Sequence, residues 1–87
     1  MTYNEIIDKA YQTFGEAERK NKAGEECLEL ALALVHERDG KASAWDVIGE
    51  IADVQIMLWC LMRIYGIDAV RKRIEEKKQR LEALLNV

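Results

Sequence analysis

The spacing of apolar residues constrains the fold of this chain more than any other feature. These residues recur every three or four positions along the 87 residues, and no proline interrupts them. Such spacing places apolar side chains on one face of an α-helix, whereas a half-buried strand needs them at alternate positions. Breaks at Gly15, Asp39-Gly40-Lys41 and Gly66 divide the chain into four such segments. The sequence predicts an all-α fold, a four-helix antiparallel bundle, in a single domain spanning residues 1–87.

Capping motifs mark two of the helix starts. In a capping box, two side chains three residues apart bond to each other's backbone N–H groups. Thr2 with Glu5 and Ser43 with Asp46 have this spacing. Together with the breaks, they predict a first helix that ends near Gly15, a second that ends near Arg38, a third that ends at Tyr65 and a fourth that begins around Ile67.

The predicted helices carry more apolar surface than a chain of this length can cover. A domain this short buries only about 60% of the surface of its unfolded chain. Residues 27–35 are apolar nearly all round apart from Glu29, so the second helix is expected to be buried on more than one side. The last helix has its own apolar stripe, formed by Ile67, Val70, Ile74, Leu81 and Leu84. We therefore expect the chain to oligomerise through its apolar helix faces, as a homodimer or homotetramer.

Charge and composition exclude several function classes. A net charge of -3 argues against a nucleic-acid binder, which needs a basic excess. Cys27 and Cys60 lie in apolar helical stretches, which predicts small buried side chains in a reducing compartment. The longest apolar run, residues 47–62, is too short for a bilayer and is interrupted by two acids. The first residues also lack a secretory signal pattern. These features predict a cytoplasmic protein that binds neither nucleic acid nor membranes.

The arrangement of acidic residues is the strongest functional indication. Glu26 and Glu29 share a face of the second helix with Arg19 and Lys22, and Glu50 and Asp53 share a face of the third. Glu50 and Asp53 are the only charged residues between positions 47 and 62. A carboxylate in apolar surroundings must take up a proton or find a cation. Two such pairs on adjacent antiparallel helices predict a divalent metal site.

The ligand chemistry favours magnesium. Oxygen-only ligands select hard cations, and Mg²⁺ keeps waters and substrate phosphates among its ligands. We therefore expect a reaction at phosphate groups, with Mg²⁺ as the cofactor and Mn²⁺ as a possible substitute. A Glu-Glu-x-x-Glu string alone is usually a solvated helix face, so the inward-facing Glu50 and Asp53 give the argument its weight. No zinc-type cluster, glycine-rich phosphate loop or Ser/His/Asp set around the single His36 offers another chemistry.

Three other interpretations remain. The chain could be a non-catalytic helical module for oligomerisation or regulation, although the complete acid set counts against this. Residues 71–80 could be a nucleic-acid arm, but Glu75 and Glu76 make a mixed-charge solvated face the better interpretation. A carboxylate-bridged iron site would need a histidine three residues after Glu29 or Glu50, and neither has one.

Residues 22–30, KAGEECLEL, and 47–54, VIGEIADV, resemble the MazG-like, all-α nucleoside triphosphate pyrophosphohydrolases, whose signature is EExxE followed by ExxD. The resemblance ends at residues 77–81, KKQRL, which are similar to a closing K-x-x-R-L element. It implies hydrolysis of (deoxy)nucleoside triphosphates to monophosphate and pyrophosphate, with a role in sanitising the nucleotide pool. It also implies that the Mg²⁺ ligands are Glu26, Glu29, Glu50 and Asp53, and that these and Glu25, a secondary acid, are catalytic.

The resemblance implies substrate contacts as well. Lys77, with Arg80 as its partner, would bind phosphate, although Lys77 could instead pair with Glu76 or Glu82. Lys77 falls in the apolar stripe of the last helix, so it is expected to point inward or to snorkel. Lys22 would either contact phosphate or pair with Glu26. Trp45 could stack on a base.

The chain departs from the family pattern at three positions. Arg19 stands where a glutamine is common, Gly49 where an acid often occurs and Gln55 where a glutamate is frequent. None of these changes removes an expected metal ligand. Arg19 and Gly49 lie beside the expected pocket, so the preferred nucleotide stays open.

Overall fold

The computed structural model describes residues 1–86, which form four α-helices and no strand. The helices are α1 (Tyr3–Thr13), α2 (Glu16–Arg38), α3 (Ala44–Tyr65) and α4 (Ile67–Leu84). The predicted all-α, four-helix fold is confirmed, and the boundaries lie where the glycine breaks and capping motifs placed them. Among residues 1–86, no helix has both the length and the apolar character needed to cross a membrane.

The predicted Ser43–Asp46 capping box forms in full, whereas the predicted Thr2–Glu5 box forms in one direction only. The Thr2 hydroxyl accepts a hydrogen bond from the Glu5 backbone N–H at 3.1 Å. Ser43 and Asp46 form a complete capping box: the Ser43 hydroxyl accepts from the Asp46 N–H at 3.3 Å, and the Asp46 carboxylate accepts from the Ser43 N–H at 2.8 Å. These bonds to Ser43 lower the pKa of Asp46. The turn before this cap uses Gly40 at a φ of 74°, in the left-handed region that favours glycine.

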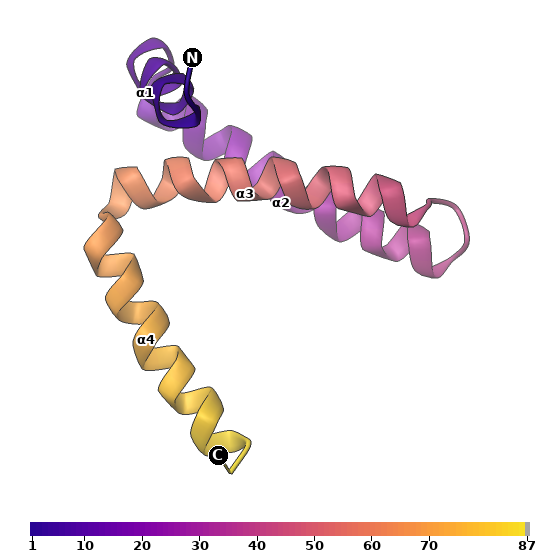
Figure 1. Cartoon of the computed structure of the whole chain (residues 1–87). Coiled ribbons are helices and arrows are strands. Elements are labelled where there is room, and N and C mark those ends of the chain that lie inside the picture. The colour runs from indigo at the N-terminus through magenta and orange to yellow at the C-terminus, as the bar shows by residue number, and fades with distance from the viewer. Residues whose placement is uncertain (87) are drawn as a thin grey trace.

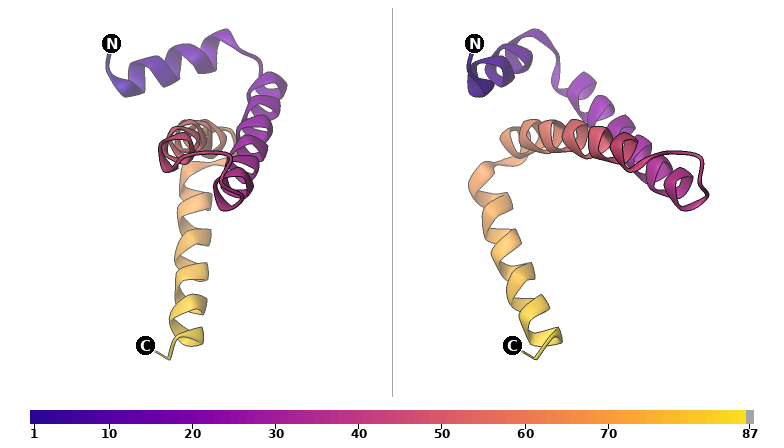
Figure 2. Two further views of the ribbon diagram at one scale, coloured as in Figure 1. Left: turned by 90° about the vertical axis from the view of Figure 1, so that its right-hand side faces the viewer. Right: turned by 45° about the vertical axis from the view of Figure 1, so that its right-hand side comes forward.

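Helices α2 and α3 lie side by side and antiparallel, joined by the turn at residues 39–43 (Figure 1). At Gly66, where φ is 109°, the chain changes direction and α4 leaves the pair at a steep angle. Both views in Figure 2 show α1 and α4 extending to opposite sides of the α2–α3 pair. Within one chain the bundle is therefore open, with the α2–α3 pair as its centre.

The core is small and lies mainly between α2 and α3. Its buried apolar residues are Ile7, Ala23, Val47, Val54 and Cys60. Cys60 is buried as predicted, but Cys27 is exposed. The expectation that residues 27–35 are buried on more than one side is also wrong for the single chain: Leu28 is 73% exposed and Leu32 54%. The reason is that, within residues 1–86, α3 packs along this stretch of α2 and covers only one of its faces.

Polar and aromatic contacts position α1. Its Tyr11 ring lies against two guanidinium groups, with the Arg19 Cζ at 3.9 Å and the Arg63 Cζ at 5.3 Å from the ring centroid. Arg63 also forms an ion pair with Asp8. Cation–π contacts of this kind contribute about 0.5–1 kcal/mol each at exposed sites and more when desolvated. Ile7 is the only buried apolar residue of α1, so these contacts carry much of its docking onto α2 and α3.

Candidate metal centre

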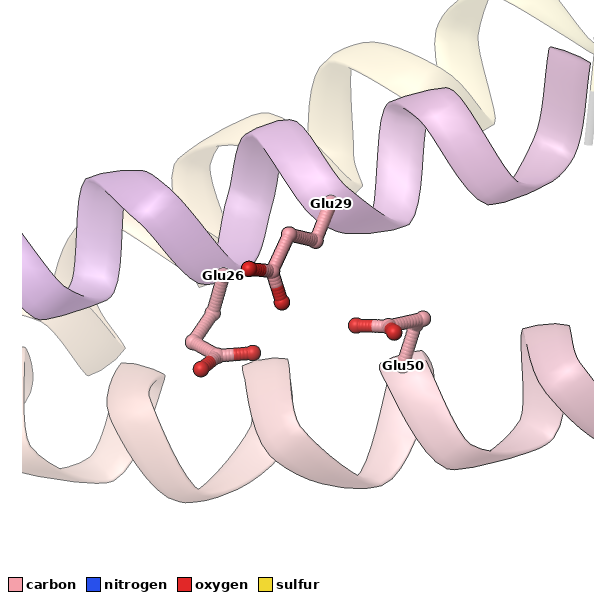
Figure 3. Close-up of side chains that lie close together, drawn as sticks. All are labelled: Glu26, Glu29 and Glu50. Atoms are coloured by element: carbon pink, nitrogen blue, oxygen red, sulfur yellow. The ribbon is translucent and has the colours of Figure 1, made fainter.

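Three glutamate side chains converge between α2 and α3. Glu26 and Glu29 come from α2 and Glu50 from α3, and one carboxylate oxygen of each lies within 4.8 Å of the others. Figure 3 shows the three side chains pointing into the space between the two helices. The three-residue spacing puts Glu26 and Glu29 on one face of α2, and the antiparallel packing brings Glu50 opposite them. The distance is within reach of a single ion that all three could bind.

Burial makes this cluster costly without a cation. Glu26 is only 7% exposed and Glu50 is half-buried. Each has an Oε2 atom that is buried and has no hydrogen-bond partner. An unsatisfied buried polar atom costs about 1–3 kcal/mol, and more when it is charged. The donor set contains only carboxylate oxygens, which is the set that a hard divalent cation such as Mg²⁺ or Mn²⁺ prefers. The residues therefore fit the predicted ion.

Lys22 partly compensates the negative charge. Its Nζ lies 3.0 Å from a Glu26 oxygen and 3.8 Å from a Glu25 oxygen. The hydrogen bond to Glu26 is the main reason why the pKa of Lys22 is raised. The helix pair expected between Lys22 and Glu26 thus forms. One ammonium group against the carboxylates of Glu26, Glu29 and Glu50 still leaves net negative charge.

The remaining repulsion between the carboxylates is reflected in the pKa of Glu29. Its pKa is raised, first by the charge of Glu26, then by desolvation and by the charge of Glu50. Glu29 is itself exposed, so its carboxylate lies on the solvent side of the cluster. A divalent ion between these groups would reverse the repulsion and favour the ionised form.

Asp53 and Glu25 lie outside the group of three. Val47 and Val54 mark the buried face of α3, and Glu50 lies close to that face. At 100° per residue, Asp53 is about 60° further round the helix than Glu50. It is exposed, and no oxygen of its carboxylate joins the cluster. Glu25 is also exposed and faces Lys22 instead. The structure thus brings together three of the four predicted metal ligands.

The predicted substrate-binding residues are more scattered. Lys22 lies at the edge of the cluster, and Trp45 lies at the start of α3, 77% exposed. Lys77 and Arg80 are exposed on α4, which extends away from the α2–α3 pair (Figure 1). Lys77 therefore neither points inward nor snorkels within one chain. Among residues 1–86 it also forms no ion pair with Glu76 or Glu82.

Two hollows flank the cluster; the larger lies beside Arg19, where a pocket was expected, and the smaller was not anticipated from the sequence. The smaller, about 260 Å³, is lined by Glu29, His36, Asp46 and Glu50. The larger, about 500 Å³, lies towards α1 and is lined by Lys22 and Glu25 among others. One sequence feature did indicate this region, because one face of α2 carries polar residues at helical spacing: Arg19, Lys22, Glu26, Glu29 and His36. That spacing gives no indication of where cavities form.

No protein-family model matches this chain, and no curated protein or solved structure matches it either. The resemblance to MazG-like enzymes accordingly stays a prediction, and the candidate centre rests on its own geometry.

Proposed function

We propose that this protein is a Mg²⁺-dependent nucleoside triphosphate pyrophosphohydrolase, which converts a (deoxy)nucleoside triphosphate to the monophosphate and pyrophosphate. One observation carries the proposal: three glutamates converge from two helices, and Glu26 and Glu50 each have a buried oxygen without a partner. A divalent ion held by these carboxylates would supply the missing partners. Its remaining coordination positions suit phosphate oxygens and water. The MazG-like resemblance supports the same reaction.

The residues have separate roles in this proposal. Glu26, Glu29 and Glu50 would hold the ion, which when bound would supply charge neutralisation at the phosphates and polarisation of water. Glu29 is the solvent-facing member and would accept a proton from the attacking water. Lys22 lies at the edge of the cluster and would contact phosphate. Asp53 lies one helical turn from Glu50, and a change of rotamer would be required to bring its carboxylate to the ion.

A second candidate function is supported by a different observation. Large apolar side chains on α3 and α4 are exposed in the single chain, among them Ile51, Leu58, Ile74 and Leu81. Surface of this kind favours association with another copy or another protein. The alternative is a non-catalytic oligomerisation or regulatory module with the same fold. It predicts association without hydrolysis, whereas the enzyme proposal predicts both.

The test is pyrophosphate release from a panel of canonical and modified nucleoside triphosphates. We expect release with Mg²⁺ and none with chelator. Loss of a metal ligand removes several kcal/mol of charge stabilisation, so Glu50→Gln should reduce the rate by about 100-fold or more. Glu37→Gln, an exposed change of the same kind on α2, is the matched control and should retain the rate. No release from any triphosphate, by protein whose helical circular dichroism is intact, would favour the oligomerisation module.

A further inference from the structure

The larger hollow has the composition of a small-molecule site. It lies between α1, α2 and α3 and measures about 500 Å³. Ala10 and Phe14 from α1 and its C-terminal cap, and Met57 and Cys60 from α3, provide apolar walls. Ligand pockets are typically clefts of about 300–1,000 Å³ with apolar walls and a few placed polar groups. This hollow is within that range.

Arg19 provides the placed polar group. It lines the hollow and is only 8% exposed. Its Nε donates to the Phe14 backbone oxygen at 3.1 Å, and its guanidinium lies 3.9 Å from the centroid of the Tyr11 ring. These two contacts fix the plane of the group. Its Nη1 is buried and has no hydrogen-bond partner. Arg19 thus carries, beside the hollow, an oriented donor that nothing within residues 1–86 satisfies.

The hollow and the acid cluster are neighbours on α2. Lys22 and Glu25 line the hollow, and Lys22 also contacts Glu26 of the cluster. Arg19 and Glu26 are seven residues apart, which is two helical turns or about 10 Å along the helix. A ligand with an anionic end at the metal and a planar apolar end in the hollow would span both. A nucleoside triphosphate has this shape.

We propose that the hollow binds the base of the triphosphate and that Arg19 donates to the carbonyl oxygen at the 6-position of a purine or the 4-position of a pyrimidine. This inference rests on the proposed function and names its substrate class, the triphosphates of keto bases. Guanine and thymine present carbonyl acceptors where adenine and cytosine present amino donors, and uracil shares the carbonyl of thymine. An amino group facing Arg19 would leave two donors opposed and both unsatisfied. Keto bases are therefore preferred over amino bases.

The first measurement compares kcat/KM for GTP, UTP, ATP and CTP. The wild type is expected to favour the keto bases by about tenfold or more. Arg19→Lys keeps the charge but loses the planar donor geometry, and should reduce this ratio to near one. Arg38→Gln, a change of an exposed arginine at the other end of α2, should leave the ratio unchanged. A wild type without keto preference, or a preference that survives in folded Arg19→Lys, would overturn the inference.

A second measurement separates this inference from the hydrolase proposal. Guanosine, uridine, adenosine and cytidine are titrated into wild-type protein with chelator present, and the Arg19 Nε–H resonance is followed by NMR. Shifts with the keto nucleosides but not the amino nucleosides support the base site even if no triphosphate is hydrolysed. No shift with any nucleoside rejects the base site even if hydrolysis occurs. This readout uses the unmodified chain, so it does not depend on whether an Arg19 variant folds.

Discussion

The α2–α3 pair and α4 have similar apolar patterns but very different surroundings. Along the pair, each helix covers the other, and Ala23, Val47 and Val54 are buried. In α4, none of the residues is buried, and Ile74, Leu81 and Leu84 are all more than half exposed. An amphipathic pattern thus identifies which face of a helix will be covered. It does not identify what covers it, and within residues 1–86 nothing covers the α4 stripe at Ile74, Leu81 and Leu84.

The residues expected to take part in the reaction are also divided between these two regions. The pair carries the acid cluster, and α4 carries Lys77 and Arg80, the predicted phosphate ligands. Within one chain α4 extends away from the pair that carries the acids (Figure 1). If Lys77 and Arg80 act on the triphosphate, they must reach it from the α4 of another copy. The chain would then be active only as an oligomer with shared sites.

The largest expected effect comes from mixing two inactive chains. Glu50→Gln removes a metal ligand from the pair, and Lys77→Ala removes a cation from α4. If sites are shared, each variant alone should be nearly inactive, and an equimolar mixture should regain pyrophosphate release because some sites contain both intact residues. A Lys77→Ala chain that retains full activity would show that α4 takes no part in the chemistry.

The next prediction, with a smaller expected effect, distinguishes apolar surface that is buried within the chain from apolar surface that another copy buries. Val54→Ala removes two buried methyl groups from the pair and should cost about 2 kcal/mol of unfolding free energy without changing the molecular mass in solution. Ile74→Ala on α4 should reduce the mass measured by light scattering at fixed concentration, because it removes apolar surface that we expect a second copy to cover.

The same experiment can contradict the expected assembly. If α4 is solvated in the functional protein, Ile74→Ala will leave the mass unchanged and alter the unfolding free energy by less than about 0.5 kcal/mol. Urea unfolding at two protein concentrations separates the cases, since only a stability that depends on association varies with concentration.

The smallest expected effect concerns Glu29 and pH. Its raised pKa means that the metal-free folded chain binds more protons than the unfolded chain between the ordinary value of 4.5 and the folded value. The free energy of unfolding therefore falls as pH rises through that window. Glu29→Gln should remove this loss and raise the metal-free Tm at pH 7. Added Mg²⁺ should raise the Tm of the wild type more than that of the variant, and equal shifts would contradict the metal site.

The sequence was sufficient for the helices but not for all of the site. Gly15, Gly66 and the Ser43–Asp46 cap set the helix boundaries through local backbone chemistry, which a single sequence reveals. Glu26, Glu29 and Glu50 could be grouped because helical spacing and antiparallel packing are enough to align them. The separation of Asp53 depends on the rotation of α3 against α2, and the burial of Arg19 depends on how α1 docks. Both are tertiary properties that periodicity does not encode.

Gly66 is the only residue between α3 and α4. The 18-residue α4 is about 27 Å long, so a rotation of about 10° in the backbone at this joint moves its far end by about 5 Å. The φ and ψ angles of Gly66 therefore determine the direction of the whole of α4. A side chain at position 66 would be strained at a φ of 109°. If the backbone changed its torsion angles to relieve that strain, α4 would point in a different direction as one rigid helix. A change at position 66 could thus misalign Lys77 and Arg80 without altering any residue near the acids.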